Sequence, residues 1–233
     1  MSKPEGIIII VTRNNLHLTK KAIKSALGQD IDCQVVLIDN VSTDGTVQWA
    51  RTKPGLATIE LMNQQSLSAC WNLGLKVAWS LGYAHALVCN NDIELRPDAY
   101  RLLLANGGPF VTCVSVDTSE QADEPPAPGN VRPHPDFSCF LIRKEVTDKV
   151  GWFNEAYYPA YVEDCDYHVR MHRSGIEAIS IGVPFLHHGV STVKSCSPQD
   201  KHIIQRGADK NRAMFKSVYG CLPGTPEYAE LFR

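Results

Sequence analysis

Residues 7–12 have the sequence IIIIVT, and this segment decides the fold of the chain. An uninterrupted run of β-branched residues is typical of a strand that is buried on both faces. Residues 34–39, QVVLID, are a second run of this kind, and residues 19–27 between them have the apolar spacing of a helix. A strand, a crossover helix and another strand predict a parallel sheet covered by helices.

The same alternation continues along the chain. Short apolar runs predict further strands at residues 58–61, 84–89, 110–116, 137–142, 176–181 and 184–187. Helical spacing predicts further helices at residues 67–81, 97–106, 144–150, 162–174 and 200–219. We therefore predict an α/β protein with a mostly parallel central sheet and helices on both faces.

The chain is long enough for one domain with a sizeable core, because 44% of its 233 residues are hydrophobic. Residues 117–136 interrupt the alternation. They are rich in proline and have no apolar period, which predicts a long surface loop. We expect a single domain over residues 1–233, which consists of halves at 6–116 and 137–190 on either side of this loop and a helical tail at 191–233.

Charge and cysteine content narrow the class of protein. The 23 basic and 25 acidic side chains give a formal net charge of −2, whereas proteins that hold nucleic acid through charge carry an excess of Lys and Arg. No apolar run approaches the roughly 20 residues of a membrane-spanning helix, and no secretory signal is evident, so we expect a cytoplasmic protein. The eight cysteines are spread singly along the chain, which predicts free thiols.

Polar side chains follow the predicted strands at the edge where open α/β sheets bind ligands. The clusters are Thr12-Arg13-Asn14, Asp39-Asn40, Asn90-Asn91-Asp92 and, at the start of a helix, Glu163-Asp164-Cys165-Asp166. Each cluster alone is also what a turn or a helix cap requires, as at Asp44. The sequence has no glycine-rich phosphate-binding motif, so a bound nucleotide would need a divalent cation held by carboxylates.

Six segments in order resemble the family 2 glycosyltransferases of GT-A fold. They are VTRN (11–14), LIDNVSTDGT (37–46), WNLG (71–74), CNND (89–92), EDCD (163–166) and HHG (187–189). Their order and spacing are most similar to the rhamnosyltransferase-like branch. The resemblance implies a nucleotide-sugar-binding first half and an acceptor and catalytic second half. It also implies a metal-dependent, inverting transfer of a sugar from a nucleotide-diphosphate sugar to a hydroxyl group.

The resemblance assigns the donor-binding residues to the ends of the predicted strands. Asp39 accepts a hydrogen bond from the base, and a carboxylate suits the imide N–H of uracil, which favours a UDP-sugar. The other residues that it places around the nucleotide and sugar are Thr12, Arg13, Asn14, Asn63, Asn72, Asn91 and Asp92. For Asn72 a cap or a bridge between backbone groups is an equal alternative.

The metal site is expected at Asp92. Residues 90–92 resemble the Asp-x-Asp motif of the family with Asn in its first position, so one carboxylate is left for Mn²⁺ or Mg²⁺. His187 or His188 is the expected second ligand, and imidazole suits Mn²⁺ better than Mg²⁺. Adjacent residues of a strand point to opposite faces, so only one of the two takes part. We prefer His188, next to Gly189.

The resemblance also assigns the general base to Asp164, which deprotonates the acceptor hydroxyl. Asp166 is expected to orient Arg170, its i,i+4 neighbour. The alternative is that these acids only complement the dipole of a helix N-terminus. Tyr157, Tyr158 and Tyr161 follow a partial match to another family segment, and they are either core residues or an apolar platform for the acceptor.

Two other functions compete with sugar transfer. A nucleotidyltransferase of similar fold is one, although its usual glycine-rich signature is missing after the first strand. A non-catalytic nucleotide- or glycan-binding module is the other, and the Asn at position 90 favours it. The acceptor is expected to be a glycan or, less in keeping with the sequence, a modified nucleic acid, for which a basic bias in the C-terminal region would help.

Overall fold

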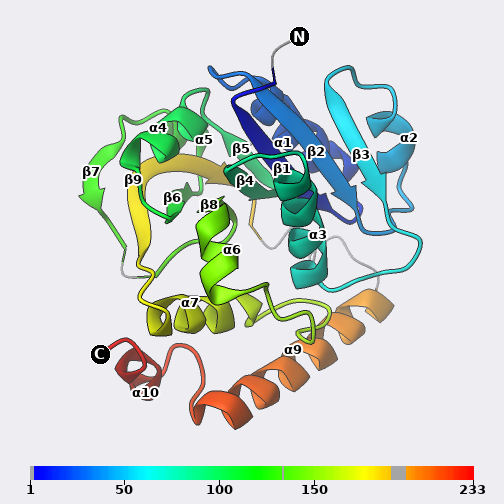
Figure 1. Cartoon of the computed structure of the whole chain (residues 1–233). Helices are drawn as coiled ribbons and strands as arrows, with labels where there is room; N and C mark the ends of the chain where they lie inside the picture. Colours follow the sequence, from blue (N-terminus) through cyan, green and yellow to red (C-terminus); the bar gives the residue numbers. More distant parts are fainter. Residues whose placement is uncertain (1–2, 133, 190–197) are drawn as a thin grey trace.

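The computed structural model describes residues 3–132, 134–189 and 198–233, and within them nine strands form one sheet (Figure 1). The strands are β1 (Gly6–Thr12), β2 (Cys33–Asp39), β3 (Leu56–Glu60), β4 (His85–Asn90), β5 (Ile93–Leu95), β6 (Phe110–Val116), β7 (Ala127–Asn130), β8 (Cys139–Arg143) and β9 (Ala178–His187). Their order across the sheet is β3-β2-β1-β4-β8-β6-β9-β5, and β7 pairs with β9.

Helices cover both faces of this sheet, as predicted (Figure 1). They are α1 (Leu16–Leu27), α2 (Thr46–Ala50), α3 (Leu67–Ser80), α4 (Ala99–Asn106), α5 (Ser119–Ala122), α6 (Lys144–Val150), α7 (Glu163–Arg173), α9 (Pro198–Tyr219) and α10 (Pro226–Glu230).

The place of β1 in the sheet explains why residues 7–11 are uniformly apolar. Ile7 and Ile9 pack into one core with α3, α6 and α7, whereas Ile8 and Ile10 pack into a second core with α1 and α4. These four side chains are at most 1% exposed. Since successive residues of a strand face opposite sides, a strand covered by helices on both sides has no position for a polar residue before its end.

An aromatic cluster stands in the core beneath α3. The ring of Trp71 lies 5.5 Å from Phe140 and 5.0 Å from Phe153, between centroids, and the Phe140 contact is edge-on at 84°. Phe137 joins the cluster at 6.4 Å from Trp71. Edge-on and tilted aromatic pairs of this kind stabilise a core beyond the area that they bury. The cluster ties α3 to β8 and to the chain before α7.

The sheet is mixed, whereas the sequence predicted a mostly parallel one. Strands β1, β2, β3 and β4 pair in parallel, but β8 is antiparallel to both of its neighbours, β4 and β6. Strand β5 is likewise antiparallel to β9. Strands β6 and β9 pair in parallel again. An apolar run indicates that a strand is buried and carries no information on the direction of its neighbours, so the parallel prediction holds for β1 to β4 and only in part for the later strands.

Several elements differ from the predicted boundaries. Residues 176–181 and 184–187 belong largely to one strand, β9, which contains Pro184 and pairs with β6 across an irregularity in register. The predicted loop at 117–136 contains α5, whose capping box joins Thr118 and Gln121, and β7. Two short elements of the first half, α2 and β5, were not predicted, because five residues of helix or three of strand are too few to show a period.

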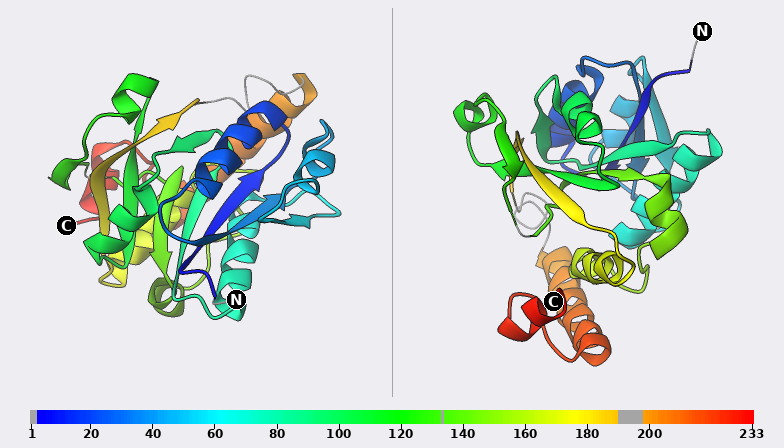
Figure 2. Two further views of the ribbon diagram at one scale, coloured as in Figure 1. Left: turned by 90° about the horizontal axis from the view of Figure 1, so that it is seen from above. Right: turned by 60° about the vertical axis from the view of Figure 1, so that its left-hand side comes forward.

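The C-terminal helices α9 and α10 lie beneath α7, at the end of the molecule opposite the N-terminus (Figures 1 and 2). They form a third apolar cluster with α7, which contains Tyr157, Val162, Val169, Phe215, Cys221 and Tyr228. The seven cysteines in the described part of the chain are free thiols, as predicted, and Cys196 lies outside it. Among the described helices, none has the length and apolar character that crossing a membrane requires.

Candidate functional site

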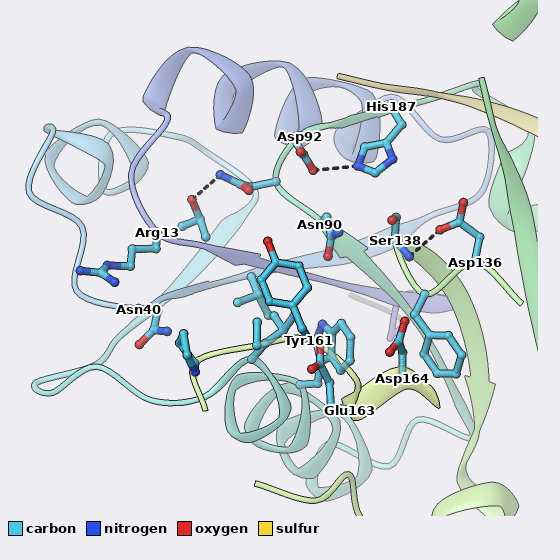
Figure 3. Close-up of a pocket in the computed structure, with 18 of the residues that line it drawn as sticks. Arg13, Asn40, Asn90, Asp92, Asp136, Ser138, Tyr161, Glu163, Asp164 and His187 are labelled. Atoms are coloured by element: carbon cyan, nitrogen blue, oxygen red, sulfur yellow. Dashed lines mark hydrogen bonds and ion pairs between the residues drawn. The ribbon is translucent and has the colours of Figure 1, made fainter. Parts of the chain in front are cut away.

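A cavity of about 630 Å³ opens at the carboxyl ends of β1, β2 and β4. The first half of the chain contributes Val11, Thr12, Arg13, Asn40, Gln64, Gln65, Leu67, Trp71, Asn90, Asn91 and Asp92 to its walls. The second half contributes Arg132, His134, Pro135, Asp136, Phe137, Ser138, Pro159, Ala160, Tyr161, Glu163, Asp164, His187 and Ile204. Figure 3 shows Asp92 and His187 on one side of the cavity, with Glu163 and Asp164 on another. The fold thus brings the predicted donor side and the predicted catalytic side to one space.

The donor side is joined by hydrogen bonds between the ends of three elements. The parallel register places Thr12 opposite Asp39, so β1 and β2 end at the same edge. The Asn91 amide Nδ2, which follows β4, donates to Thr12 Oγ1 and Thr19 Oγ1, both at 3.0 Å. Asn91 therefore fastens the end of β4 to β1 and α1, and its buried side chain lines the cavity.

Asp39 is buried at this edge, and only one of its two carboxylate oxygens has a hydrogen-bond partner. Its Oδ1 accepts a hydrogen bond from the Ser42 backbone N–H at 2.9 Å, whereas Oδ2 is buried and makes no hydrogen bond. The residues beside it, Thr12 and Asn40, line the cavity. A buried acceptor without a donor is costly unless a ligand supplies the donor.

Four of the predicted donor-binding residues are not among those that line this cavity: Asp39, which lies beside the lining residue Asn40, and Asn14, Asn63 and Asn72. Asn14 holds the loop after β2 instead, since its Oδ1 accepts from the Thr43 backbone N–H at 2.8 Å. Asn63 is exposed in the segment after β3. Asn72 is fully buried; its Nδ2 donates to the Phe153 carbonyl at 2.9 Å, and its Oδ1 accepts from the Phe153 N–H at 3.0 Å. The backbone bridge, which was the alternative for Asn72, is therefore what the structure contains.

The two adjacent histidines have different side-chain partners, and the imidazole of His187, not that of His188, lies beside the Asp92 carboxylate. His187 Nε2 lies 3.4 Å from Asp92 Oδ1 (Figure 3). This hydrogen bond raises the pKa of His187 above its ordinary value. His188 Nε2 lies 2.8 Å from Glu94 Oε1, which Lys21 also contacts at 3.0 Å. The preference for His188 as a metal ligand is thus at odds with the geometry.

Asp92 and His187 fit a divalent cation by their chemistry. One carboxylate and one imidazole are a donor set that suits Mn²⁺, and Mg²⁺ also accepts the carboxylate. Within residues 3–132, 134–189 and 198–233, no group of three or more His, Cys, Asp or Glu side chains is placed to hold a metal ion. A cation at this position would therefore need phosphate oxygens and water to complete its coordination.

The catalytic side is the first turn of α7. Glu163 is buried, and its Oε2 has no hydrogen-bond partner. Burial, and then the charge of Asp164, raise the pKa of the Glu163 carboxyl well above its ordinary value. Burial also raises the pKa of Asp164, against the hydrogen bond that its Oδ1 accepts from the Cys165 backbone N–H at 2.8 Å. A carboxylate with a raised pKa is a better proton acceptor at neutral pH.

Asp166 points away from the cavity and has a structural role. Its Oδ2 lies 2.8 Å from Arg170 Nε, which confirms the predicted pair. Its Oδ1 accepts a hydrogen bond from the Tyr219 hydroxyl at 2.8 Å. Asp166 therefore joins α7 to α9, and the two acids of the cavity are left as the chemically available ones of this segment. Of the three tyrosines that could form an apolar platform, Tyr157 is fully buried and therefore belongs to the core.

The backbone that leads into α7 is strained. Tyr161 and Val162 have φ values of 82° and 76°, in the left-handed region that side chains with a Cβ rarely adopt, and Val162 is β-branched. Such residues cost on the order of 1–3 kcal/mol each and persist where their surroundings hold them. Tyr161 lines the cavity and is 42% exposed.

Sequence reasoning missed the contribution of the segment before β8. Asp136 and Ser138 line the cavity between His187 and Asp164, and Asp136 Oδ1 accepts from the Ser138 backbone N–H at 2.9 Å (Figure 3). Arg132, from the same segment, donates to the Ser115 carbonyl at 3.2 Å. The Asp-x-Ser pattern of an Asx turn was a local signal for order here, but the proline content of the segment hid it.

Comparison with known proteins supports the predicted family and confirms the predicted fold. The family model described as Glycosyl transferase family 2 matches residues 7–106, less than half of the chain. No curated protein matches the chain. The similarity to this family therefore rests on residues 7–106, and the rhamnosyltransferase-like branch stays a prediction.

Solved structures of GT-A glycosyltransferases share the fold at low sequence identity. The mannosyltransferase PcManGT from Pyrobaculum calidifontis, in complex with GDP-Man and Mn²⁺, is 16% identical with a TM-score of 0.60, over 99% of this chain and 79% of its own. S. aureus TarS 1-349 is 15% identical with a TM-score of 0.58, over 98% and 77%. GalNAc-T7 with UDP, GalNAc and Mn²⁺ is 12% identical with a TM-score of 0.62, over 79% and 44%. With the family match, these findings support a glycosyltransferase.

Proposed function

We propose that this protein is a metal-dependent, inverting glycosyltransferase that moves a sugar from a nucleotide-diphosphate sugar, with UDP as the favoured nucleotide, to a hydroxyl acceptor. The observation that carries the proposal is that one cavity joins the Asp92–His187 pair to the first turn of α7, where Asp164 stands. A donor diphosphate on the first side would direct its sugar toward a carboxylate on the second.

The nucleotide would bind at the edge formed by β1 and β2. The free Oδ2 of Asp39 supports recognition of a base that presents an N–H donor, as the uracil imide does. Thr12 and Arg13 would line the same site, and Asn91 would border the ribose while it holds the ends of β1 and β4 together. The UDP preference rests on this carboxylate.

The diphosphate would lie against Asp92 and His187, which would hold the cation. Mn²⁺ or Mg²⁺ supplies positive charge to the departing nucleoside diphosphate when bound. PcManGT and GalNAc-T7 were each solved with Mn²⁺ together with GDP-Man or UDP, and the imidazole of His187 favours the same ion here.

Asp164 would act as the general base. Its carboxylate would take the proton from the acceptor hydroxyl as the oxygen attacks the anomeric carbon, while the bond from that carbon to the diphosphate oxygen breaks on the opposite face. Burial supports this role, because it raises the pKa of Asp164 and so raises its affinity for that proton. Tyr161 and Ile204, on the rim beside it, would contact the acceptor, which we propose to be a glycan.

The proposal is tested by a panel of UDP-, GDP- and dTDP-linked sugars, with Mn²⁺, Mg²⁺ or excess chelator. We expect at least one UDP-sugar to raise the melting temperature in the presence of Mn²⁺ and to release UDP slowly with water as the acceptor. Stabilisation without any turnover, even with glycan acceptors, would favour the binding module. No stabilisation by any nucleotide sugar would contradict the proposed function.

A further inference from the structure

Helix α9 packs closely against the chain that leads into α7. A Cβ at Gly207 would clash with Pro159 and would lie 2.7 Å from the Tyr158 carbonyl oxygen, so the helix approaches this segment as near as a glycine permits. One turn earlier, Ile204 reaches the cavity itself. The helix is thus in direct contact with residues 158–162, which we call the lead-in segment.

Asn211 is the polar contact between α9 and the lead-in segment. Its side chain is fully buried, and its Nδ2 donates to the Ala160 carbonyl at 2.8 Å and to the Tyr161 carbonyl at 3.2 Å. An amide NH₂ has two hydrogens, so it can serve both acceptors. Two successive backbone carbonyls of a partly buried loop are satisfied by one side chain from a helix about 50 residues away in sequence.

Those two carbonyls belong to the strained part of the chain. Tyr161 and Val162 have left-handed backbone conformations, and Val162, at the N-cap of α7, provides no side-chain hydrogen bond to the first turn. The local sequence therefore neither favours this conformation nor caps the helix. Contacts from outside the segment must hold it, and the Asn211 amide supplies two hydrogen bonds in the required place.

We propose that Asn211 is a positioning residue that holds the lead-in segment in its strained form and thereby fixes Glu163 and Asp164 in the cavity. Without the amide, the carbonyls of Ala160 and Tyr161 would lose this partner, and rotation of their peptide planes toward ordinary φ values would relieve the strain as well. Either rotation moves the first turn of α7. The inference rests on the proposed function for its catalytic consequence and on the geometry alone for its structural one.

Two variants disturb this contact from different sides. Asn211→Leu keeps the approximate shape of the side chain and removes both N–H donors. Gly207→Ala keeps the Asn211 amide, but the added methyl group overlaps Pro159 and pushes α9 away from the lead-in segment. Ser217→Ala is the matched control, because Ser217 lies on the exposed side of the same helix and donates only to the Met214 carbonyl.

The structural readout is amide hydrogen exchange over residues 158–166, which needs no substrate. We expect faster exchange there in Asn211→Leu and Gly207→Ala, with residues 85–95 unchanged, and no difference in Ser217→Ala. The kinetic readout is Mn²⁺-dependent release of UDP from a UDP-sugar. There kcat should fall roughly 10- to 100-fold in both variants, with the KM of the donor within about twofold, because only the catalytic side is displaced.

The outcomes separate this inference from the proposed function. Unchanged exchange over residues 158–166 in both variants, or a donor KM that rises while kcat holds, would overturn the positioning role. Faster exchange in both variants of a protein that turns over no nucleotide sugar would support the positioning role while the proposed function failed. If Asn211→Leu does not fold, Gly207→Ala decides by the same two measurements.

Discussion

The two sides of the cavity are stabilised in different ways. On the donor side, several polar side chains satisfy each other, as Asn91 does with Thr12 and Thr19, although Asp39 Oδ2 has no partner and Val41 is also in a left-handed conformation. On the catalytic side, Glu163 is buried with an unpaired oxygen, and the chain before it is held in left-handed conformations. The first side is therefore preorganised by its own residues, while the second depends on a helix that the C-terminal region supplies.

This difference predicts which functional property a substitution on each side should change. The hydrogen bonds of the donor side support one another. Substitutions there should therefore change the affinity for the nucleotide donor. The strained segment depends on contacts from distant parts of the chain, and the carboxyl groups next to it have raised pKa values. Substitutions on the catalytic side should therefore change the rate of turnover and its pH dependence. Four measurements test this division.

The largest effect is expected for Asp164→Asn. The variant keeps the size of the side chain and removes the proton acceptor, so turnover should fall by about 10²-fold or more while nucleotide affinity persists. Steady-state kinetics and calorimetry with UDP check the two parts. Glu163→Gln and Asp166→Asn are the controls. If Asp166→Asn abolished turnover and Asp164→Asn did not, the base would be the wrong carboxylate of the segment.

His187→Ala should come next, with a loss of roughly 10- to 100-fold in apparent Mn²⁺ affinity, the size that metal-site perturbations usually have. The change removes the imidazole that contacts the Asp92 carboxylate, whereas His188→Ala removes a partner of Glu94. Activation by Mn²⁺ titration measures both. Equal losses of Mn²⁺ affinity in the two variants would contradict the assignment of His187, rather than His188, to the metal site.

Asp39→Ala should weaken UDP binding by about 1–3 kcal/mol through loss of a charged hydrogen bond. The rate at saturating donor should change little, because Asp39 lies on the donor side. Calorimetry measures the affinity, and Asp44→Ala serves as a comparison, since Asp44 only accepts from Leu16 and Thr46 at the surface. An unchanged affinity for UDP in Asp39→Ala would disprove the placement of the base.

The smallest effect is expected in stability, from Glu163→Gln. Folding raises the pKa of Glu163, so the folded chain binds this proton more tightly than the unfolded chain does. The stabilising contribution is complete below the ordinary Glu pKa of about 4.3 and is lost as the pH rises through the raised value. Glu163→Gln should therefore be more stable than the parent at pH 8, by roughly 1 kcal/mol. Chemical denaturation at pH 4 and pH 8 should show this gain only at the higher pH.

The predictive power of the sequence follows the same division. The buried parallel strands, the polar edge at Thr12, Asp39 and Asp92, and the pair Asp166–Arg170 were accessible because each depends on residues a few positions apart. The sequence did not predict the antiparallel direction of β8, the cavity wall at Asp136 or the contacts of Asn72. Asn72 reaches Phe153 and Asn211 reaches Ala160 only after the chain has folded, and no local period records such contacts.

The aromatic cluster under α3 gives the protein an optical property. Trp71 is 2% exposed, it lines the cavity, and its Nε1 makes no hydrogen bond, so its fluorescence should lie at short wavelength and respond when a ligand enters. Trp152 is 39% exposed under Lys76, on a surface away from the cavity, and its emission should lie at longer wavelength and stay constant. Once the other two tryptophans, the half-buried Trp49 and Trp79, are replaced by Phe, the blue edge of the spectrum would report occupancy of the cavity without a label and without knowledge of the acceptor.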